Sequence, residues 1–451
     1  MKITLSWLKD HLETSAAIGR IADALTHIGL EVEAVEDRSK TLSPFTVALV
    51  KECKRHPNAD KLSVCMVETG KATLQIVCGA PNARAGMKAV FAPAGAIVPG
   101  TGLELKVSSI RGVESNGMLL SELEMGLSQE HEGIIELPQR AEIGASVARV
   151  MGLDDPVLEI KLTPNRADCA GVHGIARDLA AAGLGTLKER PIETVAGKFV
   201  SPIKTGLEFP KGKESACPLF AGRLIRNVQN GHSPEWLQHR LAAVGLRPIS
   251  ALVDVTNYLS LDRARPLHVF DADKLKGHLR ARLAKDGETL EALDGRNYTL
   301  DSEMCVIADE RAALGIAGVM GGAETSCTPV TRNVFIEAAL FDPARTARTG
   351  RRLGIVSDAR YRFERGVDPE FCLPGLELAT KLILEFCGGE ASEIVVAGAV
   401  PEWRRTIAFP SSRVEKLAGL KLPESDAKKI LASLGFTAEG AGALTSTQAF
   451  A

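Results

Sequence analysis

The sequence predicts an α+β protein built from several domains. The chain has 451 residues, and about 150 residues per domain gives about three domains. Segments with helical spacing lie on both sides of a stretch of about 90 residues that is rich in short β-prone runs. Aromatic residues make up only 4% of the chain, so aliphatic side chains must fill most of the cores. We therefore expect a small α/β domain interrupted by a β barrel, then a mixed α/β domain, then an incomplete C-terminal α/β domain.

Charge and cysteine content narrow the class of protein. A net charge of -2 argues against a uniformly basic surface, although a local basic patch is enough to bind nucleic acid. The nine cysteines include no Cys-x-x-Cys pair, so neither a disulfide framework nor a ribbon-type zinc site is indicated. The N-terminus lacks the apolar core of a signal peptide, and no apolar run of about 18 residues is present. These features fit a reducing cytoplasm.

The first and third segments of the chain form one discontinuous domain in this interpretation, residues 1–40 with 151–190. A helix is expected over residues 15–30, closed by Gly29 and followed by a short strand. Its apolar residues recur at helical spacing, at Ile18, Ile21, Leu25 and Ile28. A second helix is expected over residues 175–182, with residues 165–168 as its cap.

Short strands dominate the intervening domain, residues 41–150. They are expected over residues 46–53, 62–68, 73–78, 88–91 and 103–107. Glycine-containing turns separate several of them. Five strands in about 90 residues predict a small barrel, for which the OB-fold is the commonest five-stranded candidate.

The second half of the chain alternates helices with β-rich runs. Residues 191–213 are polar and predict a connector, and residues 214–400 predict a mixed α/β domain. Its helices are expected over 235–244, 344–351 and 376–386, and its strands over 279–284, 304–308 and 334–339. Residues 401–451 contain one helix, over residues 427–434, which has too little following chain to bury it. We therefore expect a truncated domain.

Three motifs in the barrel region occur in a distinctive order. They are HPNADKL at 56–62, VCGAPN at 77–82 and SNGMLLSELEMGL at 115–127. Together they resemble the tRNA-binding barrel shared by several synthetase-associated proteins. Such a barrel offers a groove in which basic side chains meet phosphates and bases stack on aromatic side chains. The candidate tRNA-binding residues are Lys51, Lys54, Arg55, Lys61 and Arg111.

Each of these cations has a simpler interpretation as a solvated surface residue. Stacking aromatics are also nearly absent from this domain, with only Phe91 after Phe45. The barrel therefore serves either to hold RNA or mainly as a shape-reading or packing unit.

A second series of motifs runs through the rest of the chain. It comprises LTPNRADCAGVHGIARDL at 162–179, GLRPISALVDVTNYL at 245–259, RPLHVFDADKL at 265–275, GVMGG at 318–322, NVFIEAALFDP at 333–343 and SDARYRFERGVDP at 357–369. This series resembles the β subunit of bacterial phenylalanine–tRNA ligase. The resemblance covers residues 1 to about 436.

The resemblance implies partners and cofactors. The family's β subunit assembles with an α subunit as an α2β2 heterotetramer and binds tRNA for phenylalanine. Activation of phenylalanine uses ATP and magnesium on the α subunit, and the acidic metal-ligand positions of the β subunit lie beyond residue 451. We therefore expect no metal site here and no aminoacylation by this chain alone. Residues 214–400 are expected to be the editing domain, which hydrolyses tyrosine wrongly attached to this tRNA.

Glu337 is the candidate that recognises the tyrosine hydroxyl. It stands alone in the apolar run Val334–Leu340, and a carboxylate among such neighbours needs a partner. By resemblance, that partner is the phenol. An apolar site rejects an added hydroxyl poorly, whereas phenylalanine in a site with a buried polar group leaves that group unpaired. The structural alternative is an ion pair with an arginine such as Arg352.

The other candidates are also assigned by resemblance. His268 orients water or the terminal ribose, which suits an imidazole near neutrality; the alternative is a structural histidine. Thr256 and Asn257 bind water and the adenosine end, or only cap a turn. Gly321 and Gly322 allow close approach of the substrate, or only form a tight turn.

Two further positions line the expected pocket. They are Ser357, where the family often has threonine, and Ala359, whose small side chain leaves room for a ring. No nucleophile–His–acid triad, phosphate loop or HExxH motif is present, so hydrolysis would use positioned water.

Two alternatives stay open. Cys53, His56, Cys65 and Cys78 are the nearest approach to a zinc constellation, although their spacings match no common ligand pattern. In addition, the chain by itself is either an editing hydrolase or a non-catalytic tRNA-binding and assembly scaffold.

Overall fold

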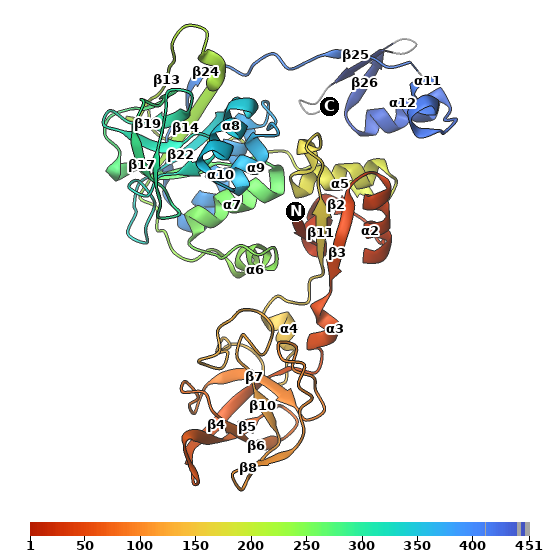
Figure 1. Ribbon diagram of the computed structural model, residues 1–451, viewed down its shortest axis with the longest axis vertical. Helices are drawn as coiled ribbons and strands as arrows, with labels where there is room; N and C mark the ends of the chain where they lie inside the picture. Colours follow the sequence, from red (N-terminus) through yellow and green to blue (C-terminus); the bar gives the residue numbers. More distant parts are fainter. Residues whose placement is uncertain (411, 440–442, 447–451) are drawn as a thin grey trace. The chain divides into compact units, whose positions relative to one another are not determined.

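The computed structural model describes residues 1–410, 412–439 and 443–446 (Figure 1). The chain divides into two compact units. Unit 1 comprises residues 1–34 and 158–451, and unit 2 comprises residues 35–157, so unit 2 is an insertion within unit 1. The protein is thus a mixed α+β multidomain chain. Among the described residues, no helix combines the length and apolar character needed to cross a membrane.

The N-terminal part of unit 1 is a small sheet covered by helices. The strands lie in the order β1 (Lys2–Thr4), β11 (Val157–Lys161), β3 (Glu31–Glu36), and β2 (Leu12–Glu13) pairs with β12 (Thr186–Leu187). The helices are α1 (Leu5–His11), α2 (Ile18–His27) and α5 (Val172–Ala181). Ile21 and Leu25 of α2 are fully buried, and Gly29 follows the helix at φ 87. The expected helix at residues 15–30 is therefore present, with shorter ends.

The cap expected for the second helix is wrong. Residues 165–168 lead into a 3-10 turn, η1 (Ala167–Cys169), and Gly171 is the residue that precedes α5. The side chains of Asp168 and Arg166 bond to each other and so do not cap the helix.

Unit 2 contains a five-stranded antiparallel sheet. Its order is β10 (Gly117–Leu119), β7 (Lys88–Pro93), β4 (Thr46–His56), β5 (Ala59–Glu68), β6 (Thr73–Cys78). A hairpin of β8 (Ser108–Ile110) and β9 (Val113–Ser115) and two short helices, α3 (Arg38–Leu42) and α4 (Val147–Val150), complete it. Two separate apolar clusters pack around these elements.

The strand expected at residues 103–107 is wrong. This segment makes only an isolated bridge between Ile97 and Glu104. Leu103 and Val107 are 56% and 54% exposed, and only Leu105 between them reaches a core. The fifth strand of the sheet is β10 instead.

Residues 199–398 contain two five-stranded sheets and several helices. The first sheet has the order β13 (Thr205–Glu208), β16 (Leu279–Leu283), β19 (Cys305–Ala308), β20 (Ala313–Ile316), β21 (Met320–Gly321). The second has the order β15 (His268–Asp271), β22 (Val334–Leu340), β14 (Leu219–Arg226), β23 (Glu390–Ala391), and β24 (Val395–Gly398) also pairs with β14. Because β13 pairs in parallel with β16, the expected connector contributes a strand.

These two sheets and two helices make three layers. The helices α7 (Ala251–Arg263) and α10 (Cys372–Cys387) pack on one face of the second sheet through Leu252, Leu259, Leu376 and Ile383. The opposite face packs on the first sheet through Phe220, Phe270, Phe335, Leu279 and Ile307. The remaining elements are η2 (Glu214–Ala216), α6 (Glu235–Ala243), η3 (Ala272–Lys274), β17 (Thr289–Glu291), β18 (Asn297–Thr299), α8 (Pro343–Leu353) and α9 (Asp358–Phe363).

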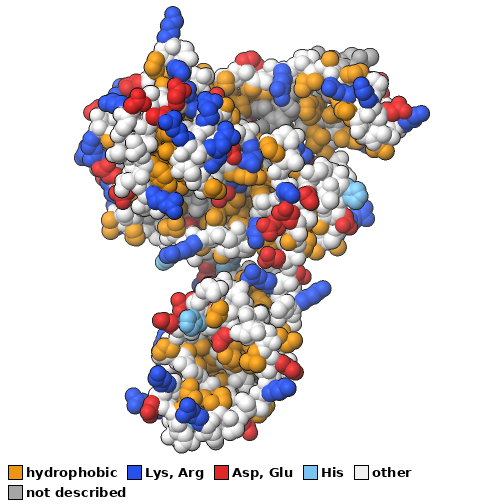
Figure 2. Space-filling view, in the orientation of Figure 1, with side chains coloured by type: hydrophobic (Ala, Val, Ile, Leu, Met, Phe, Trp, Pro, Cys, Tyr) orange, Lys and Arg blue, Asp and Glu red, His pale blue; other side chains and the backbone are white. Residues whose placement is uncertain are grey.

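The C-terminal segment is a separate small sheet with two helices. Its strands lie in the order β25 (Thr406–Ala408), β27 (Ala443–Ser446), β26 (Phe436–Glu439), and its helices are α11 (Ser412–Ala418) and α12 (Glu424–Ser433). The helix expected at residues 427–434 corresponds to α12. The face in Figure 2 mixes acidic and basic side chains over both units, which agrees with the net charge of -2.

Candidate functional site

A small cavity lies between the two sheets of residues 199–398. Its volume is about 80 Å³. Strand β15 supplies His268, strand β22 supplies Glu337, the β20–β21 turn supplies Gly318, strand β21 supplies Gly321, and helix α9 supplies Ala359. Residues that are distant in sequence therefore meet at one point.

Strand alternation places His268 and Glu337 on the same face. They are directly opposite each other across β15 and β22, and side chains at opposed positions point to the same side of a sheet. Phe270 and Phe335 share this face and enter the core between the sheets. Val269 points the other way, into the core beneath the helices.

Glu337 is a buried carboxyl group without a protein partner. It is 7% exposed, and no hydrogen bond or ion pair reaches its carboxyl group from the described residues. Burial raises its pKa to about 8, because removal from water disfavours the charged form. The expected alternative of an ion pair with Arg352 is wrong, since Arg352 bonds to Asp301 at 2.9 Å.

His268 is half-buried, and its ring is uncharged at neutral pH. Its Nε2 atom is buried without a hydrogen-bond partner, and burial lowers the pKa of the imidazole to about 4. Phe270 packs edge-on against the ring, with centroids 4.4 Å apart. On another side, a Cβ atom added at Gly321 would lie 2.4 Å from Cε1 of the ring. The absence of a side chain at Gly321 is therefore what admits the imidazole.

Ser357 shapes the cavity from outside it. It precedes α9, where its hydroxyl accepts a hydrogen bond from the Arg360 N–H at 3.1 Å. The same hydroxyl donates to the Val319 carbonyl at 2.6 Å. Ser357 does not line the cavity, but it fixes the turn that does. Ala359, two residues further along, is part of the lining.

Gly322 also lies outside the lining. Its N–H donates to the Leu314 carbonyl at 2.8 Å, and a Cβ atom there would lie 2.5 Å from the same oxygen. Gly318 is the other constrained glycine of this turn, with φ +70. The glycine pair expected at 321 and 322 thus divides into one residue at the cavity and one that holds the strand pairing.

Thr256 and Asn257 are not brought into the cavity. Both lie inside helix α7, and the Thr256 hydroxyl donates to the Val253 carbonyl at 2.8 Å. The alternative that they cap a turn is wrong, because the helix continues for six residues beyond Asn257. The cavity and these two residues are different parts of the same domain.

Several lining residues were not singled out in the sequence. They are Pro266, Leu267, Phe270, Ile307, Gly315, Ile316, Ala317, Gly318, Val319, Met320, Phe341 and Phe363. Most of them lie inside the motifs that carry the family resemblance, so the motifs gave a usable signal. Their apolar character explains why burial dominates the pKa values of Glu337 and His268.

The basic candidates of unit 2 are all exposed. Lys51 bonds to Glu68 at 2.8 Å and Lys54 bonds to Glu52 at 2.6 Å. Part of the positive charge is therefore compensated locally. Arg111 lies at the β8–β9 turn with φ 47, and Arg55 and Lys61 lie near the turn that joins β4 to β5.

The HPNADKL motif connects that ribbon to the β8–β9 hairpin. His56 is 5% exposed; its Nε2 donates to the Ile110 carbonyl at 3.0 Å and its Nδ1 accepts from the Asn58 N–H at 3.0 Å. The Asn58 side chain donates to the Arg111 carbonyl at 2.9 Å. Since both ring nitrogens of His56 are engaged with the backbone, the zinc alternative loses its only histidine.

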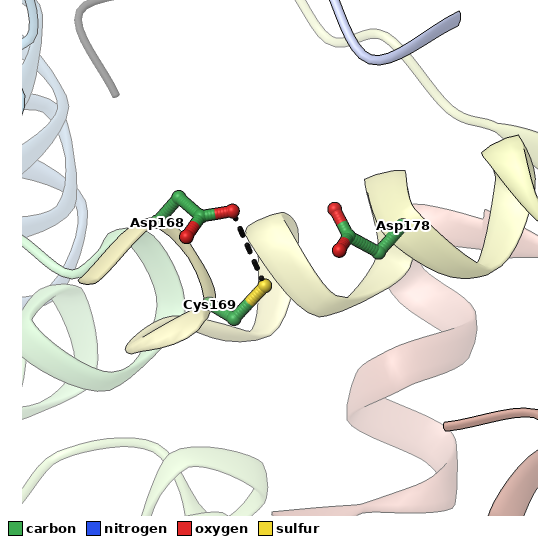
Figure 3. Close-up of side chains that lie close together, drawn as sticks. All are labelled: Asp168, Cys169 and Asp178. Carbon is green, nitrogen blue, oxygen red and sulfur yellow. Dashed lines mark hydrogen bonds between the residues drawn. The ribbon is translucent and has the colours of Figure 1, made fainter. Parts of the chain in front are cut away.

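One group of potential metal ligands occurs among the described residues, namely Asp168, Cys169 and Asp178 (Figure 3). Two guanidinium groups already neutralise it. Arg166 bonds to Asp168 at 2.9 Å and Arg177 bonds to Asp178 at 2.7 Å, with further contacts between Arg166 and Asp178 and between Arg177 and Asp168. The cluster is therefore an ion-pair network.

Comparison with known proteins assigns two segments of the chain to known domain families. The family "Putative tRNA binding domain" matches residues 45–146, and the family "B3/4 domain" matches residues 216–388. The chain thus combines a tRNA-binding domain with a B3/4 domain, and the cavity described above lies in the second.

The relatives are phenylalanine–tRNA ligase β subunits. The chain is 56% identical over 98% of its length to that of Nitrobacter winogradskyi. It is 57% identical over 98% of its length to those of Rhodopseudomonas palustris and Bradyrhizobium diazoefficiens. This chain is therefore a homologue of phenylalanine–tRNA ligase β subunits, as its motifs predict. It spans about half the length of these relatives, 54–55%.

Among solved structures, similarity extends to an N-terminal fragment of the phenylalanyl-tRNA synthetase β subunit from Pyrococcus horikoshii. That match covers 66% of this chain and 82% of the fragment, at 15% identity and a TM-score of 0.31.

Proposed function

We propose that this chain works in a phenylalanine–tRNA ligase and that its cavity hydrolyses tyrosine wrongly attached to the tRNA for phenylalanine. The observation that carries the proposal is the pair of opposed residues at the cavity. Glu337 has no protein partner and His268 has a buried, unsatisfied ring nitrogen. Buried polar groups in proteins normally have partners, and a pocket that leaves two of them free favours a polar ligand.

In this proposal Glu337 recognises the tyrosine, and His268 takes part in the hydrolysis. As a largely uncharged acid, Glu337 both donates a hydrogen bond to the tyrosine phenol and accepts one from it. A phenylalanine ring would leave this group unpaired, at a cost of about 1–3 kcal/mol. That cost corresponds to a discrimination of roughly fivefold to a hundredfold. His268, which is neutral, orients the attacking water or the terminal ribose.

The other candidates support this arrangement. Ala359 leaves room for the aromatic ring, Gly321 gives the imidazole its place, and Gly322 and Ser357 hold the surrounding turn. Thr256 and Asn257 remain our candidates for water and the adenosine end, outside the cavity lining. Hydrolysis in this proposal uses positioned water, since no serine, threonine, cysteine or lysine lines the cavity.

Unit 2 is proposed to be an OB-fold barrel that binds the tRNA. Lys51, Lys54, Arg55, Lys61 and Arg111 are exposed on or beside its β4–β5 ribbon and β8–β9 hairpin. In this scheme the barrel, residues 41–150, is inserted in a small α/β domain, residues 1–40 and 151–190. The editing domain of residues 214–400 and a C-terminal helix-and-strand domain of residues 401–451 follow.

The complete enzyme in this proposal is an α2β2 heterotetramer with tRNA for phenylalanine as substrate. ATP and magnesium would act on the α subunit. The acidic group at Asp168 and Asp178 does not fit magnesium, because Arg166 and Arg177 occupy the places of a cation. We therefore assign neither cofactor to the described residues of this chain.

The test is deacylation of tyrosyl-tRNA and phenylalanyl-tRNA, both made on the phenylalanine tRNA. We expect the chain, alone or in its ligase, to cleave the tyrosyl ester faster. His268→Ala should slow this cleavage, and Glu337→Ala should remove the preference for tyrosine. His232→Ala is the matched control, because His232 is an exposed histidine of the same unit.

Equal cleavage of both esters, or full activity in His268→Ala, would reject the editing assignment. If the ligase edits while the chain alone binds tRNA without cleavage, the chain alone is the scaffold of the alternative interpretation. The short span of this chain relative to its homologues makes that comparison necessary.

A further inference from the structure

Two cysteines of unit 2 face each other across neighbouring strands. Cys53 of β4 is directly opposite Cys65 of β5 in the antiparallel register. Their Sγ atoms lie 3.6 Å apart, and the Cys65 thiol donates to Cys53. Both are free thiols. The proposed editing and RNA-binding roles use neither of them.

The backbone geometry suits a covalent bond between them. Opposed residues of an antiparallel pair have Cα atoms about 4.5–5.5 Å apart, within the range of about 4.4–6.8 Å that disulfides span. Their side chains leave the same face of the sheet. A sulfur separation of 3.6 Å therefore needs only side-chain rotation to close to a bond of about 2.05 Å.

The two thiols differ in access. Cys53 is half-buried, whereas Cys65 is fully buried. Burial raises the pKa of the Cys65 thiol, with the hydrogen bond to Cys53 as a further cause. An oxidant therefore meets Cys53 first, and Cys65 is placed to react with whatever forms on it.

Cys78 is the one competitor in the neighbourhood. It lies on β6 opposite Ser63 and is 6% exposed. Because Ser63 and Cys65 point to the same face, Cys78 is a diagonal neighbour of Cys65. No hydrogen bond joins Cys78 to Cys53 among the described residues, in contrast to the direct Cys53–Cys65 contact.

We propose that Cys53 and Cys65 are a redox-active dithiol that forms a reversible cross-strand disulfide. With a small disulfide such as oxidised glutathione, the Cys53 thiolate attacks one sulfur and releases one glutathione thiolate. Cys65, after losing its proton, then attacks Cys53 sulfur and releases the second glutathione. The two protein thiols lose two electrons and two protons, and the oxidant takes up both electrons as two thiols.

The bond would tie together the ribbon that carries Lys51, Lys54, Arg55 and Lys61. Cross-linking the segment 53–65 restricts the unfolded chain while the folded strands are already in place. Oxidation should therefore raise the melting temperature of unit 2 by several degrees. It should leave the paired strands as they are.

The experiment equilibrates the whole chain with reduced and oxidised glutathione at stepped ratios. We expect the nine thiols to fall by two in the oxidising range, with peptide mapping giving a 53–65 cross-link that dithiothreitol reverses. Cys65→Ser should stop at a glutathione adduct on Cys53. Cys78→Ala, the matched control, should still form the cross-link.

Nine thiols throughout the titration would overturn the proposal. So would a cross-link between Cys53 and Cys78, or a glutathione adduct on Cys53 in the wild-type chain that never resolves. The melting temperature of the oxidised chain gives a second readout, which in the Cys65→Ser variant should not respond to oxidation.

Discussion

Burial acts in opposite directions on the two residues at the cavity. It raises the pKa of Glu337 to about 8 and lowers that of His268 to about 4. In each case the charged form is the one that loses contact with water. Near pH 7 the opposed strands therefore carry a neutral acid beside a neutral base. Such a pair can exchange hydrogen bonds with a phenol or a water without first desolvating a charge.

The proton on Glu337 should make stability depend on pH. Between pH 4.5 and 8 the unfolded carboxyl group is ionised while the folded one keeps its proton. The protonated Glu337 carboxyl therefore contributes its full stabilisation below pH 4.5. As pH rises to 8, this contribution to the free energy of unfolding is lost, by about 1.4 kcal/mol per pH unit. We expect wild type to lose stability relative to Glu337→Gln as pH rises from 5 to 8, measured by urea unfolding. The exposed Glu385→Gln variant serves as control, and parallel wild-type and Glu337→Gln curves would contradict the shifted pKa.

A methyl group at Gly321 should displace the imidazole. The added Cβ atom would lie 2.4 Å from Cε1 of His268, which is closer than real Cβ contacts allow, so the ring must move. We expect Gly321→Ala to reduce tyrosyl-tRNA deacylation by about tenfold or more, since small displacements of a positioning group are costly. Gly231→Ala, where an added Cβ meets nothing within 4 Å, should retain the rate. Unchanged cleavage in Gly321→Ala would show that the His268 position is unimportant.

At the scale of helices and strands, apolar periodicity predicted more elements than local cap and turn signals did. The helices expected at 235–244, 344–351 and 376–386 correspond to α6, α8 and α10, and the apolar run at 334–339 corresponds to β22. Apolar spacing records which face of an element is buried, and that is set by the whole fold. Helix α7 was missed because its face toward the core is mixed with Asp254, Asp262 and other buried polar residues.

The composition of the cavity was only partly predictable from the sequence. The motifs identified Glu337, His268, Gly321 and Ala359, which do line it. They also suggested Thr256, Asn257, Gly322 and Ser357, which do not. Motif membership places a residue in the neighbourhood, whereas strand register and the β20–β21 turn decide which side chains reach the cavity. Those long-range pairings leave no local pattern in the sequence.

The turn at the cavity should depend on the Ser357 hydroxyl. It both caps α9 and donates to the Val319 carbonyl. Loss of a cap or of a buried hydrogen bond costs about 1 kcal/mol each. Ser357→Ala should therefore lower the free energy of unfolding by about 1–2 kcal/mol and raise KM for tyrosyl-tRNA. Ser357→Thr retains the hydroxyl and should stay close to wild type in both measurements. An equal loss of stability in the two variants would assign the effect to side-chain shape instead of hydrogen bonding.

At the scale of the whole molecule, unit 1 is held together by a buried polar contact between its first and later segments. Asp262 of α7 is 2% exposed and accepts from the Trp7 indole at 2.7 Å. It also lies 2.6 Å from Nε2 of His11, and Trp7 stacks on Tyr258 with centroids 5.2 Å apart. Desolvation of Asp262 is outweighed by the bonds from His11 and Arg263, so its pKa is lowered to about 2. Unit 2 shares none of these residues.

Because the chain divides into two units, the stability of each unit can be measured separately. All tryptophans and tyrosines lie in unit 1, at positions 7, 236, 403, 258, 298 and 361. Fluorescence thus reports unit 1 alone, whereas circular dichroism reports both units. Asp262→Asn leaves buried polar partners with a weakened acceptor, and breaking a buried ion pair costs about 3–5 kcal/mol. We expect Asp262→Asn to lower the unfolding midpoint that fluorescence reports for unit 1. The second transition seen by circular dichroism, that of unit 2, should stay where it is.

The reciprocal variant completes this prediction. Ile76 is fully buried in unit 2, and Ile76→Ala should cost about 2–5 kcal/mol there without moving the fluorescence transition. The stabilisation that Asp262 gives unit 1 should also disappear as pH falls from 3.8 through about 2. Protonation of the carboxylate removes the negative charge that its partners favour. If either variant shifted both transitions equally, the units would unfold as one body. The insertion would then share its stability with the domain that surrounds it, and a tRNA bound to unit 2 would stabilise the cavity as well.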